Sequence, residues 1–70
     1  MNMNLLKARM IQNNTSAEEL SKAIGISKAS FYRKISSKTE FTRAEISDIS
    51  RILSLDASDV MAIFFGNEAS

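Results

Sequence analysis

The chain of 70 residues contains no cysteine, no histidine and no proline. Without cysteine there is neither a disulfide framework nor a thiolate metal site. Without histidine, zinc would have only carboxylates as ligands, which makes a structural zinc site improbable. We therefore expect no metal and no cofactor, and a domain this small must be held together by helix packing or by a partner subunit.

Long apolar runs are also missing. The longest, VMAIFF at residues 60–65, is far shorter than the ~18 residues of a membrane span. The first ten residues, MNMNLLKARM, lack the apolar core and the small-residue cleavage site of a signal peptide. We expect a cytoplasmic protein that has no membrane partner.

The sequence offers no groups for an enzyme. It has only two glycines and no glycine-rich phosphate loop, and histidine and cysteine are absent. The acidic residues that lie close together, such as Asp56 and Asp59, have the spacing of helix caps. A helical chain of this length leaves little room for a pocket, so we predict no catalytic residues and no small-molecule ligand.

What the sequence does contain is an uneven distribution of charge. Residues 1–38 carry seven Lys and Arg against two acids, whereas residues 39–70 carry two Arg against six acids. The segment 21–34, SKAIGISKASFYRK, holds four basic residues and no acid. This asymmetry suggests one face that meets a polyanion and another face turned away from it.

The spacing of the apolar residues is mostly three to four, without sustained alternation, which is typical of an all-α domain. We predict helices at residues 4–13, 17–24, 28–35, 43–53 and 57–65. The residues expected to face inward are Leu5, Leu6, Met10, Leu20, Ile24, Ile26, Phe31, Ile35, Ile46, Ile49, Leu53, Leu55, Val60, Ile63 and Phe64.

N-cap residues predict the starts of four helices. Ser16 with Glu19 fits a capping box, in which the serine oxygen accepts an N–H and the glutamate reaches back. Thr42 and Asp56 begin the same arrangement, each with an acid three residues later. Ser27 follows Ile26 and precedes Phe31, the pattern of an N-cap with a hydrophobic staple.

Gly25 predicts the turn between the second and third helices. A residue in the left-handed conformation ends many helices, and glycine adopts it without a Cβ penalty. Because Ser27 starts the next helix after only two intervening residues, the two helices must cross steeply. This is the geometry of a helix-turn-helix.

The segment SAEELSKAIGISKASFYRKI, residues 16–35, resembles the helix-turn-helix of Cro/repressor-type (Xre-like) DNA-binding proteins. The resemblance implies a five-helix, lambda-repressor-like domain over residues 1–66, followed by a short tail at 67–70. It also suggests a small Cro-like regulator of a phage or prophage. Two positions depart from the family pattern. Ala17 replaces a frequent glutamine that binds phosphate, and Lys34 stands where an apolar residue is usual, so the helix is rotated slightly or Lys34 snorkels from its edge.

The resemblance further implies that the third helix enters the major groove of double-stranded DNA, with the residues after its cap meeting base edges. Carried over by position, the residues that contact bases are Lys28, Ala29, Ser30 and Arg33. Those that contact the DNA backbone are Ser16, Ser27, Tyr32, Ser36, Ser37, Lys38 and Thr39. Weaker candidates for phosphate contacts are Lys7, Arg9, Lys22 and Lys34.

Phe64 and Phe65 are adjacent, so one helix face cannot bury both. We expect Phe64 in the core and Phe65, with Met61, at a homodimer interface, because a palindromic operator calls for a two-fold protein.

A transcriptional repressor is the simplest function. The alternative is a protein-interaction module on the same fold, an antitoxin or adaptor, that uses its acidic C-terminal half or its apolar tail.

Overall fold

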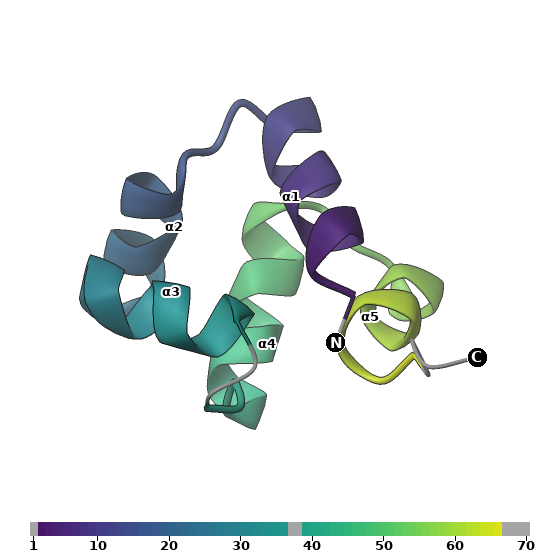
Figure 1. Ribbon diagram of the computed structural model, residues 1–70. Helices are drawn as coiled ribbons and strands as arrows, with labels where there is room; N and C mark the ends of the chain where they lie inside the picture. Colours follow the sequence, from purple (N-terminus) through teal and green to yellow (C-terminus); the bar gives the residue numbers. More distant parts are fainter. Residues whose placement is uncertain (1, 37–38, 67–70) are drawn as a thin grey trace.

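The computed structural model describes residues 2–36 and 39–66, which form five helices and, within these ranges, no strand. The helices are α1 (Met3–Gln12), α2 (Ala17–Ile24), α3 (Lys28–Ile35), α4 (Arg43–Ile52) and α5 (Ala57–Phe64). The all-α prediction is confirmed, and every helix boundary lies within one residue of the predicted one. Figure 1 shows α2 and α3 on one side of α4, with α1 and α5 on the other. No helix of the described part is long and apolar enough to cross a bilayer.

The helices begin where side chains cap them. The side chain of each N-cap accepts a hydrogen bond from the backbone N–H three residues later; these caps are Asn2, Ser16, Ser27, Thr42 and Asp56. The predicted capping boxes are complete in α2, α4 and α5, where Glu19, Glu45 and Asp59 accept the N–H of the cap residue in return. These local contacts explain why the helix starts were predictable.

The two capping glutamates, Glu19 and Glu45, make the stability depend on pH. Backbone and side-chain hydrogen bonds from Ser16 lower the pKa of Glu19 below its ordinary value of 4.5. At Glu45 burial works to raise the pKa, but hydrogen bonds from Thr42 and Lys34 and the attraction of the Lys34 ammonium outweigh it, and the pKa is lowered. Stability from both carboxylates is thus fully present above the unfolded pKa of about 4.5 and is lost as pH falls through the lower folded pKa.

We therefore expect the urea concentration at the midpoint of unfolding to decrease as the pH is lowered from 5 to 3. The double variant Glu19→Gln/Glu45→Gln should lose less stability over the same interval, because the amides at these two capping positions do not titrate. Circular dichroism during urea titrations at several pH values measures this. An equal fall for both proteins would show that these carboxylates do not carry the acid sensitivity.

Gly25 ends α2 in the left-handed conformation, with φ of 81°. The N–H of Ile26 donates to the carbonyl of Ser21 at 3.0 Å, the six-residue closure of a Schellman motif. The same turn ends α1 and α4, although the left-handed residues there are Asn14 (φ 52°) and Ser54 (φ 56°). Only the glycine was recognised in advance, because asparagine and serine are compatible with many other conformations.

Gly25→Ala tests this turn. A Cβ at Gly25 meets no atom within 4 Å, so the cost comes from the backbone conformation alone and should be about 1–2 kcal/mol. For a domain of this size it should lower Tm by roughly 4–8 °C per kcal/mol. Ser54→Gly, the reverse change in the same kind of turn, should not lower Tm. If both variants shifted Tm in the same direction, the left-handed conformation would not be the cause.

The core draws on all five helices. Its buried apolar residues are Leu6, Met10, Leu20, Ile24, Phe31, Ile35, Ile49, Leu53 and Ile63, all of which were predicted to face inward. The other six predicted residues, Leu5, Ile26, Ile46, Leu55, Val60 and Phe64, are half-buried. The prediction omitted Met3, Ala17, Phe41 and Ile52, which pack against this core.

Phe41 is the most informative of the omitted residues. It lies before α4, and its ring meets Phe31 of α3 at a centroid distance of 6.0 Å and Phe64 of α5 at 5.7 Å. Both pairs are edge-to-face, the arrangement that aromatic rings prefer. The three rings join α3 to α5 through the segment that precedes α4.

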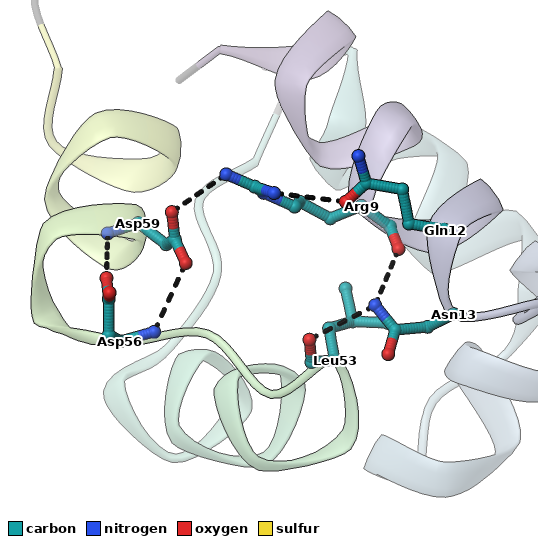
Figure 2. Close-up of polar contacts among 6 residues, drawn as sticks. All are labelled: Arg9, Gln12, Asn13, Leu53, Asp56 and Asp59. Atoms are coloured by element: carbon teal, nitrogen blue, oxygen red, sulfur yellow. Dashed lines mark hydrogen bonds and ion pairs between the residues drawn. The ribbon is translucent and has the colours of Figure 1, made fainter.

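Polar contacts join α1 to the C-terminal half of the domain (Figure 2). Arg9 donates from Nη2 to Oδ1 of Asp59 at 2.9 Å and from Nη1 to Gln12 at 3.0 Å. Asn13 donates from Nδ2 to the carbonyl of Leu53 at 3.2 Å. Because Asp59 also belongs to the capping box of α5, these bonds fix the start of α5 against α1.

Candidate nucleic-acid interface

α2 and α3 form the predicted helix-turn-helix. They are separated by Gly25, Ile26 and Ser27, and Figure 1 shows them at a steep angle to each other. Ile26 packs against the core cluster, and Phe31 and Ile35 are buried. The tight turn and these three apolar side chains determine which side of α3 faces outward.

The outward side of α3 carries all four of the predicted base-contacting residues. Lys28, Ala29 and Arg33 are exposed together with Tyr32, and Ser30 is half-buried at the same face. Their spacing along the helix, at i, i+1, i+4 and i+5, places the exposed four on one surface. We call the surface made by Lys28, Ala29, Ser30, Tyr32 and Arg33 the α3 face.

Hydrogen bonds within α3 orient Arg33. Its Nη2 donates to Ser30 Oγ at 3.0 Å, and the Ser27 hydroxyl donates to the same oxygen at 3.0 Å. Ser27 Oγ also accepts the backbone N–H of Ser30 at 3.1 Å, as the N-cap. Since Ser30 Oγ accepts from both neighbours, its own hydrogen remains available to an acceptor outside the protein.

The start of α3 differs electrostatically from those of α2, α4 and α5. Each of those helices has acidic residues in its first turn, which complement the positive end of the helix dipole. The first turn of α3 has none and begins with the basic residue Lys28. This arrangement is unfavourable for the isolated domain and favourable for an anionic partner.

Most cations elsewhere in the domain are already paired with carboxylates. Among the described residues the ion pairs are Arg9–Asp59, Lys22–Glu18, Lys34–Glu45 and Arg51–Asp48. Lys28 and Arg33 form no ion pair with any residue in the described ranges, and Lys7 and Arg43 share this property. Three of the weaker phosphate candidates, Arg9, Lys22 and Lys34, are thus engaged within the protein, whereas both predicted base-contacting cations remain available.

Lys34 does not rotate α3, because Phe31 and Ile35 both keep their places in the core. Its side chain turns toward α4, where Nζ lies 3.2 Å from Oε1 of Glu45. Of the two possibilities that the sequence left open, a slight rotation or a lysine at the edge of the core, the structure has the second.

Of the predicted backbone-contacting residues, Tyr32 belongs to the α3 face and four others lie in the described part of the chain. Ser16 and Ser27 are exposed N-caps, and Thr39 is exposed before α4. Ser36 is exposed at the end of α3, and its hydroxyl donates to the carbonyl of Tyr32 at 2.8 Å. Ser37 and Lys38 lie outside the described residues. The acids Glu18 and Glu19 at the start of α2 make that helix end less attractive to phosphate than the start of α3.

The C-terminal end of α5 carries the two residues predicted for a dimer. Met61 and Phe65 are 58% and 59% exposed, whereas Phe64 packs against the core. Phe65 borders a groove of about 330 Å³ whose other lining residues are Lys34, Thr39, Glu40, Phe41, Ile46 and Phe64. The predicted division of Phe64 and Phe65 between core and surface is therefore confirmed.

Residues 5–65 match the family model of the Cro/C1-type HTH DNA-binding domain. The match spans nearly the whole chain, and the chain belongs to this family. No significant match is found among curated proteins or among solved structures. Membership confirms the resemblance seen in residues 16–35: the chain is a DNA-binding domain, and the family is not an enzymatic one.

Proposed function

We propose that the protein is a sequence-specific transcriptional regulator, a Cro-like repressor that inserts α3 into the major groove of a palindromic operator as a homodimer. The observation that carries the proposal is the α3 face, on which Lys28 and Arg33 lie exposed with no carboxylate partner in the described residues. The first turn of α3 also lacks an acid, and a helix start without an acid favours an anionic partner.

Four residues of the α3 face have the chemistry to contact base edges. Arg33 suits guanine O6 and N7, which it can contact through two parallel hydrogen bonds, and Lys28 favours the same edge. Ala29 can pack against a thymine methyl group. Ser30 offers its hydroxyl hydrogen to a base acceptor.

The residues predicted to contact the DNA backbone would hold it without reading sequence. In this proposal Ser16, Ser27, Ser36, Ser37, Thr39 and Tyr32 donate to phosphate oxygens, and Lys38 adds charge. The hydroxyl of Ser16 accepts a backbone N–H as a cap and can still donate its hydrogen outward. The hydroxyls of Ser27 and Ser36 donate to Ser30 Oγ and to the Tyr32 carbonyl, so each would turn its hydrogen from that acceptor to a phosphate on binding.

Two copies of the chain would associate through the end of α5. Met61 and Phe65 present apolar area next to the groove beside Phe64, and a two-fold axis there would bring the same surface of each copy together. A repressor of this kind acts by occupying the operator and blocking access to the promoter.

Phe65→Ser tests the dimer. The side chain is exposed in the single chain, so its loss should leave the fold intact while it moves the dimerisation equilibrium toward monomer. Ile11→Ser is the matched control, since Ile11 is also an exposed apolar residue, 77% exposed, and belongs to α1. Sedimentation equilibrium should show a weaker dimer for Phe65→Ser only. Equal behaviour of the two variants, or a monomeric wild type at all concentrations, would contradict the proposed interface.

The alternative function is a protein-interaction module that uses the acidic C-terminal half or the exposed Met61 and Phe65. The salt dependence of binding distinguishes a DNA-binding regulator from such a module. Contacts with several phosphates make log K fall linearly with log[salt], at about −0.9 per phosphate. We expect a slope of several units for binding to duplex DNA; no measurable binding to any duplex at low salt would favour the alternative.

A further inference from the structure

The last turn of α3 is held by a half-buried ion pair. Lys34 Nζ lies 3.2 Å from Oε1 of Glu45 on α4, and the two side chains are only 15% and 13% exposed. Nζ also donates to the carbonyl of Glu40 at 3.2 Å and sits 5.8 Å from the centroid of the Phe41 ring. The ammonium therefore has three partners, all of them on the segment that leads into α4 or in its first turn.

Glu45 serves two helices at once. Its Oε1, the oxygen paired with Lys34, also accepts the backbone N–H of Thr42 at 2.8 Å in the capping box of α4. One carboxylate oxygen thus closes the start of α4 and holds the end of α3. A shift of α3 along or around its own axis would break the ion pair, whereas the capping box would survive.

The capping box alone does not require a lysine. Glu19 closes the same box in α2, where its Oε1 accepts the N–H of Ser16 at 2.9 Å, and no ion pair of Glu19 occurs in the described part of the chain. Net stability is also a weak reason for the pair, because desolvation of both charges offsets much of their attraction. What the pair supplies beyond the box is a directional contact between α3 and α4.

We propose that Lys34 and Glu45 are positioning residues for DNA recognition. Their ion pair sets the angle of α3 on the domain, and so aims Arg33, the residue just before Lys34, at the base edges. This inference rests on the proposed function, since it assigns the pair a part in reading sequence. A tilt of α3 would move Arg33 away from a guanine edge, where bidentate bonds require close alignment, and would disturb phosphate contacts much less.

Charge and geometry predict opposite effects for the loss of Glu45. Removing a negative charge close to the α3 face should by itself strengthen binding to any DNA, because the charge repels phosphates. Loss of positioning should instead weaken binding to the operator. The sign of the change in operator affinity therefore distinguishes the charge effect from the loss of positioning.

The test compares Glu45→Gln with Glu19→Gln. Both variants lose one carboxylate and keep an amide oxygen for the capping box, but only Glu45→Gln deprives Lys34 of its carboxylate partner. The probes are a duplex recovered with the wild-type protein from random DNA and a scrambled duplex of equal length. Dissociation constants are corrected for the folded fraction, measured by circular dichroism.

For Glu45→Gln we expect the ratio of selected to scrambled affinity to fall roughly 2- to 30-fold, the usual range for residues that act through a packed contact. Binding to the scrambled duplex should be unchanged or tighter. Glu19→Gln should keep the wild-type ratio. The double variant Lys34→Met/Glu45→Gln leaves no unpaired charge in the contact. Its ratio of selected to scrambled affinity should fall by the same factor, so it can replace Glu45→Gln in the test if that variant folds poorly.

An unchanged ratio in Glu45→Gln and in the double variant, with the wild type still binding the selected duplex, would overturn the positioning role and leave the proposed function intact. An equal loss in Glu19→Gln would also overturn it, because the effect would then follow from the capping boxes. Failure of the wild type to bind any duplex would overturn the proposed function and this inference with it.

Discussion

Phe31→Ala is expected to leave much of the protein unfolded at 25 °C. Phe31 is the largest fully buried side chain and is 0% exposed, and its ring packs edge-to-face on Phe41. Truncation of a buried phenylalanine to alanine costs about 3–5 kcal/mol. A core of this size rarely supplies more than about 3–5 kcal/mol of stability, so the loss is comparable to the total.

Urea titration followed by circular dichroism measures this effect. Tyr32→Ala is the matched control, because Tyr32 is the neighbouring aromatic on the same helix and is exposed. It also touches the Phe31 ring edge-to-face, at a centroid distance of 6.1 Å, so a loss of up to about 1 kcal/mol is expected there. Equal destabilisation by the two variants would contradict the assignment of Phe31 to the core and, with it, the outward placement of the α3 face.

Arg33→Ala should weaken binding to the selected operator duplex by about 1–3 kcal/mol, or roughly 5- to 150-fold, and relax the preference at one base pair. The cause is loss of a guanidinium that Ser30 holds at 3.0 Å and that has no carboxylate partner in the described residues. Arg33→Lys retains the charge but not the two-pronged geometry, so it should recover binding to scrambled DNA more than specificity.

Arg51→Ala is the control for charge, since it removes one exposed arginine from α4, where it pairs with Asp48. Its effect on the selected duplex should be small and similar for all sequences. Dissociation constants for a set of duplexes with single base-pair changes show whether Arg33 contacts a base or a phosphate. A uniform loss for Arg33→Ala over the whole set would mean that Arg33 contacts phosphate and not a base.

Much of the fold was predictable because its signals are local. The capping boxes begun by Ser16, Thr42 and Asp56 and the left-handed Gly25 lie within a few residues of the contacts they make. The left-handed Asn14 and Ser54 gave no comparable signal. Asparagine and serine occur in many other conformations, so neither residue type by itself marks such a turn.

Contacts between segments that are distant in the chain could not be predicted from the sequence. Arg9 and Asp59 are 50 positions apart, and only the packing of α1 on α5 shows that this arginine is engaged. Phe41 precedes a helix and belongs to no helical repeat, so the spacing of apolar residues did not reveal its place between Phe31 and Phe64.

The candidate site was predictable to the extent that it follows from the core. Burial of Phe31 and Ile35 turns Lys28, Ala29 and Arg33 outward, and this could be inferred from helical periodicity alone. Periodicity could not show which lysines and arginines have carboxylate partners, because that depends on how α3 meets α4. Lys34, which belongs by sequence to the same basic cluster, is bound to Glu45.

Selection of binding sites from random duplex DNA with the wild-type protein tests most directly whether α3 reads sequence. We expect an enriched palindrome whose half-sites lie about one helical turn, roughly 10 base pairs, apart, with a guanine in each half-site that Arg33→Ala no longer selects. Recovery of no common sequence after repeated rounds, from a protein shown to be folded, would contradict the proposal that this domain is a sequence-specific regulator.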